Sequence, residues 1–158
     1  MTSQSNEDDI IAKTFGKIGT TNKRFVEFGC GDGRQNNTIE LLRKGWSGIW
    51  CEPHRRRRDS AMQRFAHYPV EIHRMWVVPR NVNNIVKDPL DFLSIDIDGN
   101  DHAVWRAVAA KPRLVCIEYD AMLGVPLEEM VELGTRKGYR LHCCSASNVN
   151  AFFLRGDL

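Results

Sequence analysis

The sequence predicts an α/β fold, doubly wound and Rossmann-like, with a mostly parallel sheet that ends in an antiparallel C-terminal hairpin. Three observations predict it. Short apolar runs of strand length alternate with amphipathic segments over most of the 158 residues. The first run leads directly into three glycines, and only a Ser/Asn turn separates the last two runs. With 42% hydrophobic content we expect one domain over residues 1–158, in which residues 1–22 form an N-terminal helical segment.

The glycine turn follows the first expected strand, in the segment RFVEFGCGDG from Arg24 to Gly33. Gly29, Gly31 and Gly33 let the backbone adopt positive φ and approach a ligand closely. The carboxylate of Glu27 suits a cationic or amine-bearing group and would repel a pyrophosphate. The G-x-G-x-G spacing also differs from the G-x-G-x-x-G of dinucleotide-binding folds. The motif therefore favours S-adenosylmethionine (SAM) over a dinucleotide.

A second acidic residue supports this interpretation. The segment Gln35–Lys44 predicts a short amphipathic helix ended by Gly45, and Ser47–Cys51 predicts a buried strand with Glu52 at its carboxyl end. An acid at that position accepts hydrogen bonds from the two ribose hydroxyls of a bound nucleoside. The alternative is that Glu52 is a surface helix cap before Pro53.

The remaining elements continue the alternation. The leading segment predicts a helix that Gly19 ends. We expect helices or helical turns at His54–His67, Asn81–Val86, Asp101–Ala110 and Leu127–Lys137, and strands at Val70–Val78, Asp91–Asp96, Arg113–Glu118, Tyr139–Cys144 and Val149–Leu154. The four tryptophans are expected to pack in the core or at its edge, with base-stacking platforms as the alternative, and the five cysteines are expected to be reduced core thiols.

Several motifs in this order resemble the FkbM-type methyltransferases. They are FVEFGCGDGRQNNT, GWSGIWCEP, DFLSIDIDGNDHAVW, PRLVCIEYD and GYRLHCCSASNVNAFFLR, and the resemblance covers nearly everything after Lys23. It implies a SAM-dependent enzyme of the class I methyltransferase fold. It also implies that the segment Val78–Asn83 passes near the adenine. The implied cofactor-binding residues are Glu27, Gly29, Gly31, Asp32, Gly33, Asn37, Glu52 and Asp96.

The chain departs from that family at two places. Gly31 stands where members usually carry a bulkier residue, and only Tyr119–Pro126 fills a gap in which members commonly insert a longer segment. That region shapes the acceptor pocket. We therefore expect a pocket that is unusually open or that a second subunit completes in a homodimer.

The segment IDIDGND, Ile95–Asp101, is the expected centre of the chemistry. Asp96 ends a strand at the edge of the sheet on which ligands bind. Methyl transfer is an in-line displacement, so Asp96 and Asp98 are candidates for positioning the acceptor and His102 for accepting its proton. The alternatives are a turn at Asp98 and a helix cap at Asp101, with His102 on the helix surface.

A metal site is a further hypothesis. Asp96 together with Glu118 and Asp120 would offer the oxygen ligands that Mg²⁺ prefers, and the ion would lower the pKa of an acceptor hydroxyl. The alternative is that these acids mark strand ends without any metal, as in many folds.

Composition gives no general reason to expect nucleic acid or membrane as a partner. Lys and Arg total 22 against 20 for Asp and Glu, which gives a net charge of +2. The start of the sequence has no signal-peptide pattern, so we expect a cytoplasmic protein. The run Arg55–Arg58 is interpreted as a solvated helix start, with a nucleic-acid patch as the alternative.

The sequence supports a leading hypothesis and three alternatives. The leading one is a SAM-dependent methyltransferase that acts on an oxygen of a small molecule or sugar. The first alternative is an RNA or cap methyltransferase that uses the arginine run, and the second is a non-catalytic SAM-binding module. A nucleotide-dependent oxidoreductase comes last, because Glu27 and the glycine spacing disfavour a pyrophosphate.

Overall fold

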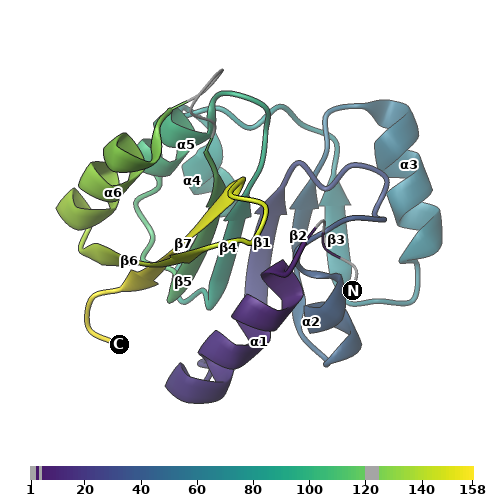
Figure 1. Ribbon diagram of the computed structural model, residues 1–158. Helices are drawn as coiled ribbons and strands as arrows, with labels where there is room; N and C mark the ends of the chain where they lie inside the picture. The colour runs from purple at the N-terminus through teal and green to yellow at the C-terminus, as the bar shows by residue number, and fades with distance from the viewer. Residues whose placement is uncertain (1–2, 4, 120–124) are drawn as a thin grey trace.

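The computed structural model describes residues 3, 5–119 and 125–158. Within them, seven strands form one sheet in the order β3-β2-β1-β4-β5-β7-β6 (Figure 1). The parallel strands are β1 (Arg24–Phe28), β2 (Ser47–Cys51), β3 (Val70–His73), β4 (Phe92–Ile95) and β5 (Leu114–Glu118). The C-terminal hairpin, β6 (Tyr139–Cys144) and β7 (Asn150–Arg155), adds two antiparallel strands. The predicted fold class is therefore confirmed.

Helices cover both faces of this sheet. The helices α1 (Glu7–Ile18), α2 (Ile39–Arg43) and α3 (Arg55–Arg64) pack on one face, and α4 (Val82–Ile85), α5 (Asp101–Ala107) and α6 (Leu127–Arg136) on the other. Successive strand residues alternate between these faces, so Phe25 contacts the first group and Val26 the second. None of the helices in the described residues is long and apolar enough to cross a membrane.

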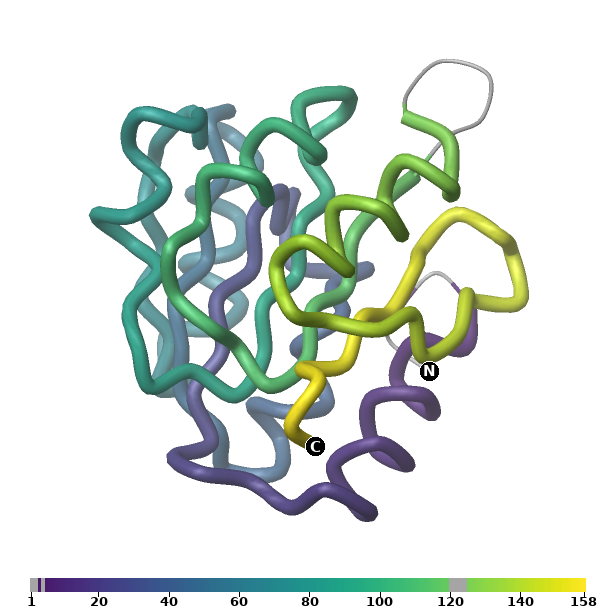
Figure 2. The backbone as a smooth tube through the Cα atoms, turned by 90° about the vertical axis from the view of Figure 1, so that its left-hand side faces the viewer, coloured from purple at the N-terminus to yellow at the C-terminus, as the bar shows by residue number. Residues whose placement is uncertain are grey.

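Helix α1 is fastened to the sheet at both ends. Its residues Ile11 and Phe15 are buried in the core. The Phe15 ring contacts Trp46 edge-on, with 4.9 Å between the ring centroids. At its start, Asn6 Oδ1 accepts a hydrogen bond of 2.8 Å from the backbone N–H of Ala146 in the β6–β7 turn. Figure 2 shows α1 beside this hairpin, although the two lie at opposite ends of the chain.

Two predicted elements are shorter than expected. The helix predicted at Gln35–Lys44 begins only at Ile39, because residues 36–38 are buried and bind Glu27 rather than continuing a helix. The strand predicted at Val70–Val78 ends at His73, and the chain then turns across the edge of the sheet. Trp76, in that segment after the edge strand, is 67% exposed, whereas Trp46, Trp50 and Trp105 are buried in the core.

Candidate functional site

A hollow of about 820 Å³ lies at the carboxyl edge of the parallel strands. It spans the crossover between β1 and β4, where the strand order reverses and where open α/β sheets bind their ligands. Four segments line it: the turn after β1, the end of β2 with the start of α3, the segment after β3, and the turn after β4. The lining residues are Gly29–Asp32, Gln35, Cys51–His54, Arg57, Met75–Val78, Asp96–Asp98 and Asn100.

The three glycines of the first turn have different tasks. Gly29, at φ +82°, lies so close to β4 that a Cβ would collide with the backbone of Asp96. A Cβ on Gly33 would lie 2.8 Å from the ring of Phe65, so that glycine lets the turn pack against the end of α3. A Cβ on Gly31 meets no protein atom within 4 Å, and Gly31 lines the hollow. Gly31 alone of the three leaves room for a ligand.

Glu52 braces the hollow from the end of β2. Its side chain is 2% exposed, which excludes the alternative of a surface cap. One carboxylate oxygen accepts a 2.9 Å hydrogen bond from the N–H of Gly31, and the other accepts 2.8 Å from the N–H of His54, just before α3. The carboxylate thus holds the glycine turn and the start of α3 together at the wall of the hollow.

Glu27 and Asn37 lie behind the glycine turn and do not line the hollow. Glu27 accepts hydrogen bonds from the N–H of Asn37 at 2.9 Å, from the amide of Asn36 and from the hydroxyl of Thr38. Asn37 Nδ2 donates to Ser94 Oγ at 3.0 Å and so links the loop to β4. These two residues, which were expected to bind the cofactor, therefore hold the loop after the glycine turn in place and do not face the hollow.

Burial changes the acidity of Glu27. The loss of solvation is the largest effect and raises the pKa of this carboxyl to about 7, although the Thr38, Asn37 and Asn36 donors lower it and Asp96 adds repulsion. The Thr38 hydroxyl in turn accepts a 2.7 Å hydrogen bond from Trp50 Nε1. Glu27 is thus the centre of a buried polar network.

The other end of the hollow includes two residues, His54 and Trp76, that the sequence did not predict to line a ligand site. His54, Arg57 and Trp76 line it together, and the Trp76 indole meets the His54 ring edge-on at 5.5 Å between centroids. Asp32 lies on the facing turn, where its carboxylate pairs with Arg34 at 3.2 Å. The sequence did not predict that Trp76 lines the hollow, because its segment has the pattern of one continuous strand. The strand ends at His73, and the chain beyond it places Trp76 at the rim of the hollow.

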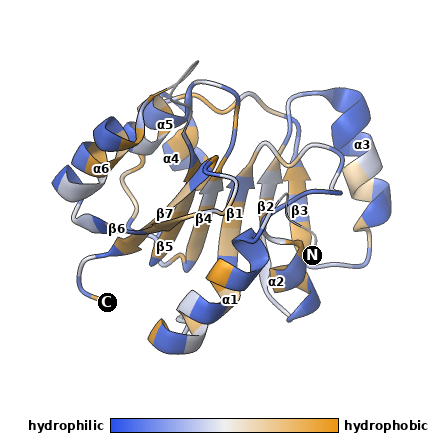
Figure 3. Ribbon diagram, viewed as in Figure 1, coloured by the Kyte–Doolittle hydropathy of each residue, from blue (hydrophilic) through white to orange (hydrophobic). Residues whose placement is uncertain are grey.

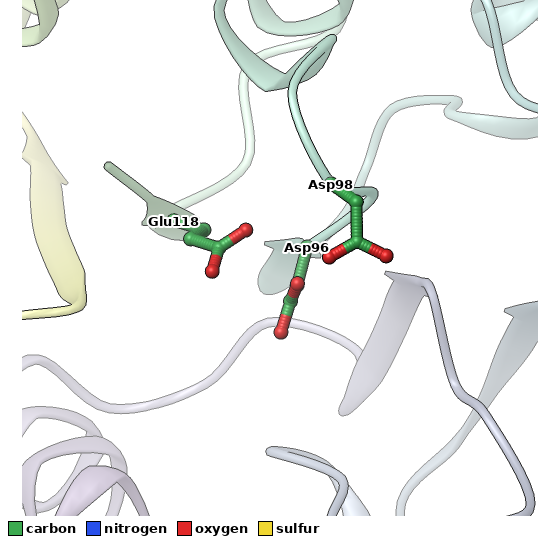
Figure 4. Close-up of side chains that lie close together, drawn as sticks. All are labelled: Asp96, Asp98 and Glu118. Atoms are coloured by element: carbon green, nitrogen blue, oxygen red, sulfur yellow. The ribbon is translucent and has the colours of Figure 1, made fainter. Parts of the chain in front are cut away.

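Three carboxyl groups converge at the strand ends beyond the glycine turn. Figure 4 shows Asp96 between Glu118 and Asp98, and one oxygen of each lies within 4.8 Å of the others. Asp96 and Asp98 follow β4 and line the hollow, whereas Glu118 ends β5. The structure thus brings the expected residues Asp96 and Asp98 together and adds Glu118 to them.

The carboxyl groups of Asp96 and Glu118 interact directly, and the pKa of each depends on the other. Burial is the largest cause of a raised pKa in both, about 6 for Asp96 and about 8 for Glu118, and neighbouring carboxylates add to it. Both carboxyl groups are therefore harder to ionise than exposed acids, and they titrate as a pair. This pair can exchange a proton with a bound molecule.

Asp101 and His102 lie on the supporting side of the turn. Asp101 is the first residue of α5, and its carboxylate accepts hydrogen bonds from the N–H groups of Ile97 at 2.9 Å and Gly99 at 3.0 Å. His102 is the next helical residue and so points in another direction; the charges that act on it come from Arg106, Glu129 and Arg136. The structure does not bring His102 to the hollow.

The expected metal ligands are only partly assembled. Asp96 and Glu118 meet as predicted, Asp98 completes the group, and Asp120 lies outside the described residues. The Mg²⁺ site stays a prediction.

Two further polar residues lie on the same face of the sheet as Glu118. Asn150 stands opposite Glu118 in the β5–β7 pairing, and its amide donates at 3.2 Å to Glu7, a fully buried residue at the start of α1. The amide oxygen of Asn150 is buried without a hydrogen-bond partner. Sequence reasoning missed both residues, because Glu7 and Asn150 are 143 positions apart.

The arginine run lies on α3, which is largely hydrophilic in Figure 3. Only Ala61 of this helix is buried. Arg55 pairs with Asp59 at 3.5 Å and Arg58 with the same carboxylate at 3.0 Å, whereas Arg56 is exposed. The exposure of these arginines agrees with the predicted solvated helix start.

No protein-family model and no curated protein matches the sequence. Solved structures with the same fold are numerous. A TehB-like SAM-dependent methyltransferase from Corynebacterium glutamicum is 14% identical, with a TM-score of 0.62 over 97% of this chain and 89% of the other. A magnesium protoporphyrin IX methyltransferase from Synechocystis with bound SAM is 11% identical, with a TM-score of 0.69 over 95% and 78%.

A third similar structure is a putative RNA methyltransferase from Pyrococcus horikoshii, 12% identical, with a TM-score of 0.65 over 95% and 83% of the two chains. These likenesses show that the chain has the class I methyltransferase fold. They do not show that the chain belongs to the FkbM-type family. Two of these neighbours are described as a porphyrin methyltransferase and a putative RNA methyltransferase. A shared fold at this identity does not identify the acceptor.

Proposed function

We propose that this protein is a SAM-dependent methyltransferase that acts on a small molecule. The observation that carries the proposal is the hollow at the β1–β4 crossover, in which a glycine with free space in front of it faces a buried carboxylate from the end of β2. The class I methyltransferase fold adds independent support.

The residues of the hollow fit SAM. Gly31 leaves space where a side chain would block a ligand, and the carboxylate of Glu52 has lone pairs left for ribose hydroxyls after accepting its two backbone hydrogen bonds. Asp32 and Asp96 supply negative charge along the wall, which suits the sulfonium and ammonium groups of SAM. When bound, SAM supplies an electrophilic methyl group.

The acceptor is expected beside Asp96. This residue ends β4 at the wall of the hollow, and with Glu118 it forms the titratable pair nearest the glycine turn. Three carboxyl groups at this end disfavour a polyanion. We therefore favour a small molecule over RNA, and the homodimer and the open acceptor pocket stay predictions.

RNA methylation remains the second candidate, because Arg57 lines the hollow and belongs to the run that begins α3. A SAM-binding module without catalysis is the alternative that the Asp96–Glu118 pair disfavours, since a binding module has no need of a proton acceptor.

Calorimetric titration with SAM and S-adenosylhomocysteine (SAH) tests the proposal, with NAD as the negative control. We expect micromolar binding, about −8 kcal/mol, for SAM and SAH and none for NAD. Glu52→Ala should weaken SAH binding at least tenfold. Glu71→Ala, which removes an exposed acid from the neighbouring strand β3, is the matched control and should leave it unchanged. Absence of SAH binding would overturn the proposal.

A further inference from the structure

We propose that the methyl acceptor is an amine that binds as its ammonium form against Glu118, Asp96 and the amide oxygen of Asn150. This inference rests on the proposed function and names the substrate class of the same site. It differs from the hydroxyl acceptor that the sequence led us to expect.

The first observation is the sign of the charges at this end of the site. The charged side chains that act most strongly on Asp96 and Glu118 are Asp98, Asp101 and Glu7, all of them acids. No lysine or arginine of the described residues is among them. A neutral hydroxyl gains little from such an environment, whereas a cation gains from every one of these charges.

The second observation is an excess of hydrogen-bond acceptors on one face of the sheet. Asn150 is the cross-strand neighbour of Glu118, so both side chains leave the sheet on the same face. Asn150 is 97% buried, since its exposed fraction is 3%, and its Nδ2 is committed to Glu7, which leaves Oδ1 without a donor. An unpaired buried acceptor costs about 1–3 kcal/mol, and this cost is removed when a donor arrives.

An ammonium group supplies what the site lacks. It carries one positive charge and several N–H donors, which matches two carboxyl groups and one free amide oxygen. One oxygen from each of Asp96, Asp98 and Glu118 lies within 4.8 Å of the others, so a single ammonium group can contact more than one of these carboxyl groups.

The transfer then balances in protons and electrons. One proton passes from the bound ammonium to a carboxylate of the Asp96–Glu118 pair and leaves a neutral amine. The nitrogen lone pair forms a bond to the methyl carbon of SAM while the carbon–sulfur bond breaks and its electron pair goes to sulfur. The products are SAH and a methylated ammonium, and the proton on the pair passes to water as the product leaves.

The test uses two SAH analogues in which nitrogen replaces sulfur and carries a short arm toward the acceptor side. One arm ends in an amine and the other, of equal length, in a hydroxyl. Calorimetry on the full chain should show the amine analogue binding at least tenfold more tightly. In Glu118→Gln this ratio should fall below threefold, while Glu132→Gln, which removes an exposed acid from α6, should preserve it.

Three results would overturn the inference. They are equal binding of the two arms, a ratio that survives Glu118→Gln while SAH still binds, and a preference for the hydroxyl arm that appears only with Mg²⁺, which would point to a metal-assisted hydroxyl acceptor instead. Loss of SAH binding in the wild type would remove the proposed function itself, whereas SAH binding without an amine preference removes only this inference. A melting curve and the SAH affinity of Glu118→Gln show that the variant is folded.

Discussion

Gly29 lies so close to the end of β4 that a Cβ built on it would sit 1.7 Å from the carbonyl oxygen of Asp96. Gly31, two residues along the same turn, has no protein atom within 4 Å of such a Cβ. Both have positive φ, +82° and +56°, so the backbone penalty for a side chain is similar and the surroundings alone differ. The two positions form a natural pair of variants.

We predict opposite outcomes for alanine at these glycines. Gly29→Ala should lower the free energy of unfolding by at least about 3 kcal/mol, because β1 and β4 must separate to admit the methyl group. Gly31→Ala should cost only about 1–2 kcal/mol for its positive φ, yet weaken SAH binding at least about tenfold by filling the hollow. Urea denaturation and calorimetry measure the two effects. Wild-type SAH affinity in Gly31→Ala would contradict the assignment of the hollow.

The order of elements could be predicted because it depends on local signals. Hydrophobic periodicity placed every strand near its observed position, and the glycine turn and the acid Glu52 identified the ligand-binding edge. The segment of residues 36–38 could not be predicted, since its hydrogen bonds to Glu27 override helix propensity. The contact between Glu7 and Asn150 was missed for a different reason: the two residues meet only when α1 docks on the C-terminal hairpin.

Asp91 should matter for stability and not for ligand binding. Its fully buried carboxylate accepts backbone N–H bonds from Thr21 at 2.9 Å, Asn22 at 3.0 Å and Lys23 at 2.7 Å, and lies 3.6 Å from Arg113 Nε. Asp91→Asn turns an acceptor into a donor that faces other donors. We expect a loss of about 3 kcal/mol of unfolding free energy in urea.

The control for Asp91→Asn is Asp88→Asn, which alters an exposed hydrogen bond to the N–H of Lys111 and should cost less than about 1 kcal/mol. Because Asp91 lies at the opposite end of β4 from Asp96, folded Asp91→Asn should bind SAH within about twofold of wild type. A tenfold loss of affinity at full folding would refute this separation.

Glu27 should make the protein less stable as the pH rises from 4.5 to 7. Its pKa is raised from 4.5 to about 7 by burial, so over this range the unfolded chain releases a proton that the folded chain keeps. The folded state binds more protons, and its stability therefore falls with pH, by up to about 3 kcal/mol for this group. Above pH 7 both states are ionised and the contribution is constant.

Glu27→Gln isolates this effect, because glutamine does not titrate. The amide opposes the Thr38 and Asn36 donors and so adds a constant cost, but the stability of the wild type minus that of Glu27→Gln should decline between pH 4.5 and 7. Urea denaturation at four pH values gives this difference. A flat difference would show that Glu27 titrates normally in the folded protein.

The arginine run decides between the small-molecule and RNA candidates. Binding of an RNA substrate would need these arginines to neutralise its phosphates, yet Arg55 and Arg58 already pair with Asp59. The acceptor side of the site also carries three acids, Asp96, Asp98 and Glu118, which repel phosphate. We therefore predict weak binding of a short single-stranded RNA, with a Kd above about 100 μM at 150 mM salt.

The double variant Arg55→Ala/Arg56→Ala completes that experiment, since neither residue lines the hollow. It should leave SAH affinity within about twofold and change the already weak RNA binding little. If the wild type instead bound the RNA below about 1 μM, and the double variant lost both affinity and about two units of the salt slope, the arginines would be phosphate contacts. That outcome would favour RNA over a small acceptor while leaving the SAM site unchanged, because Gly31 and Glu52 lie outside the run.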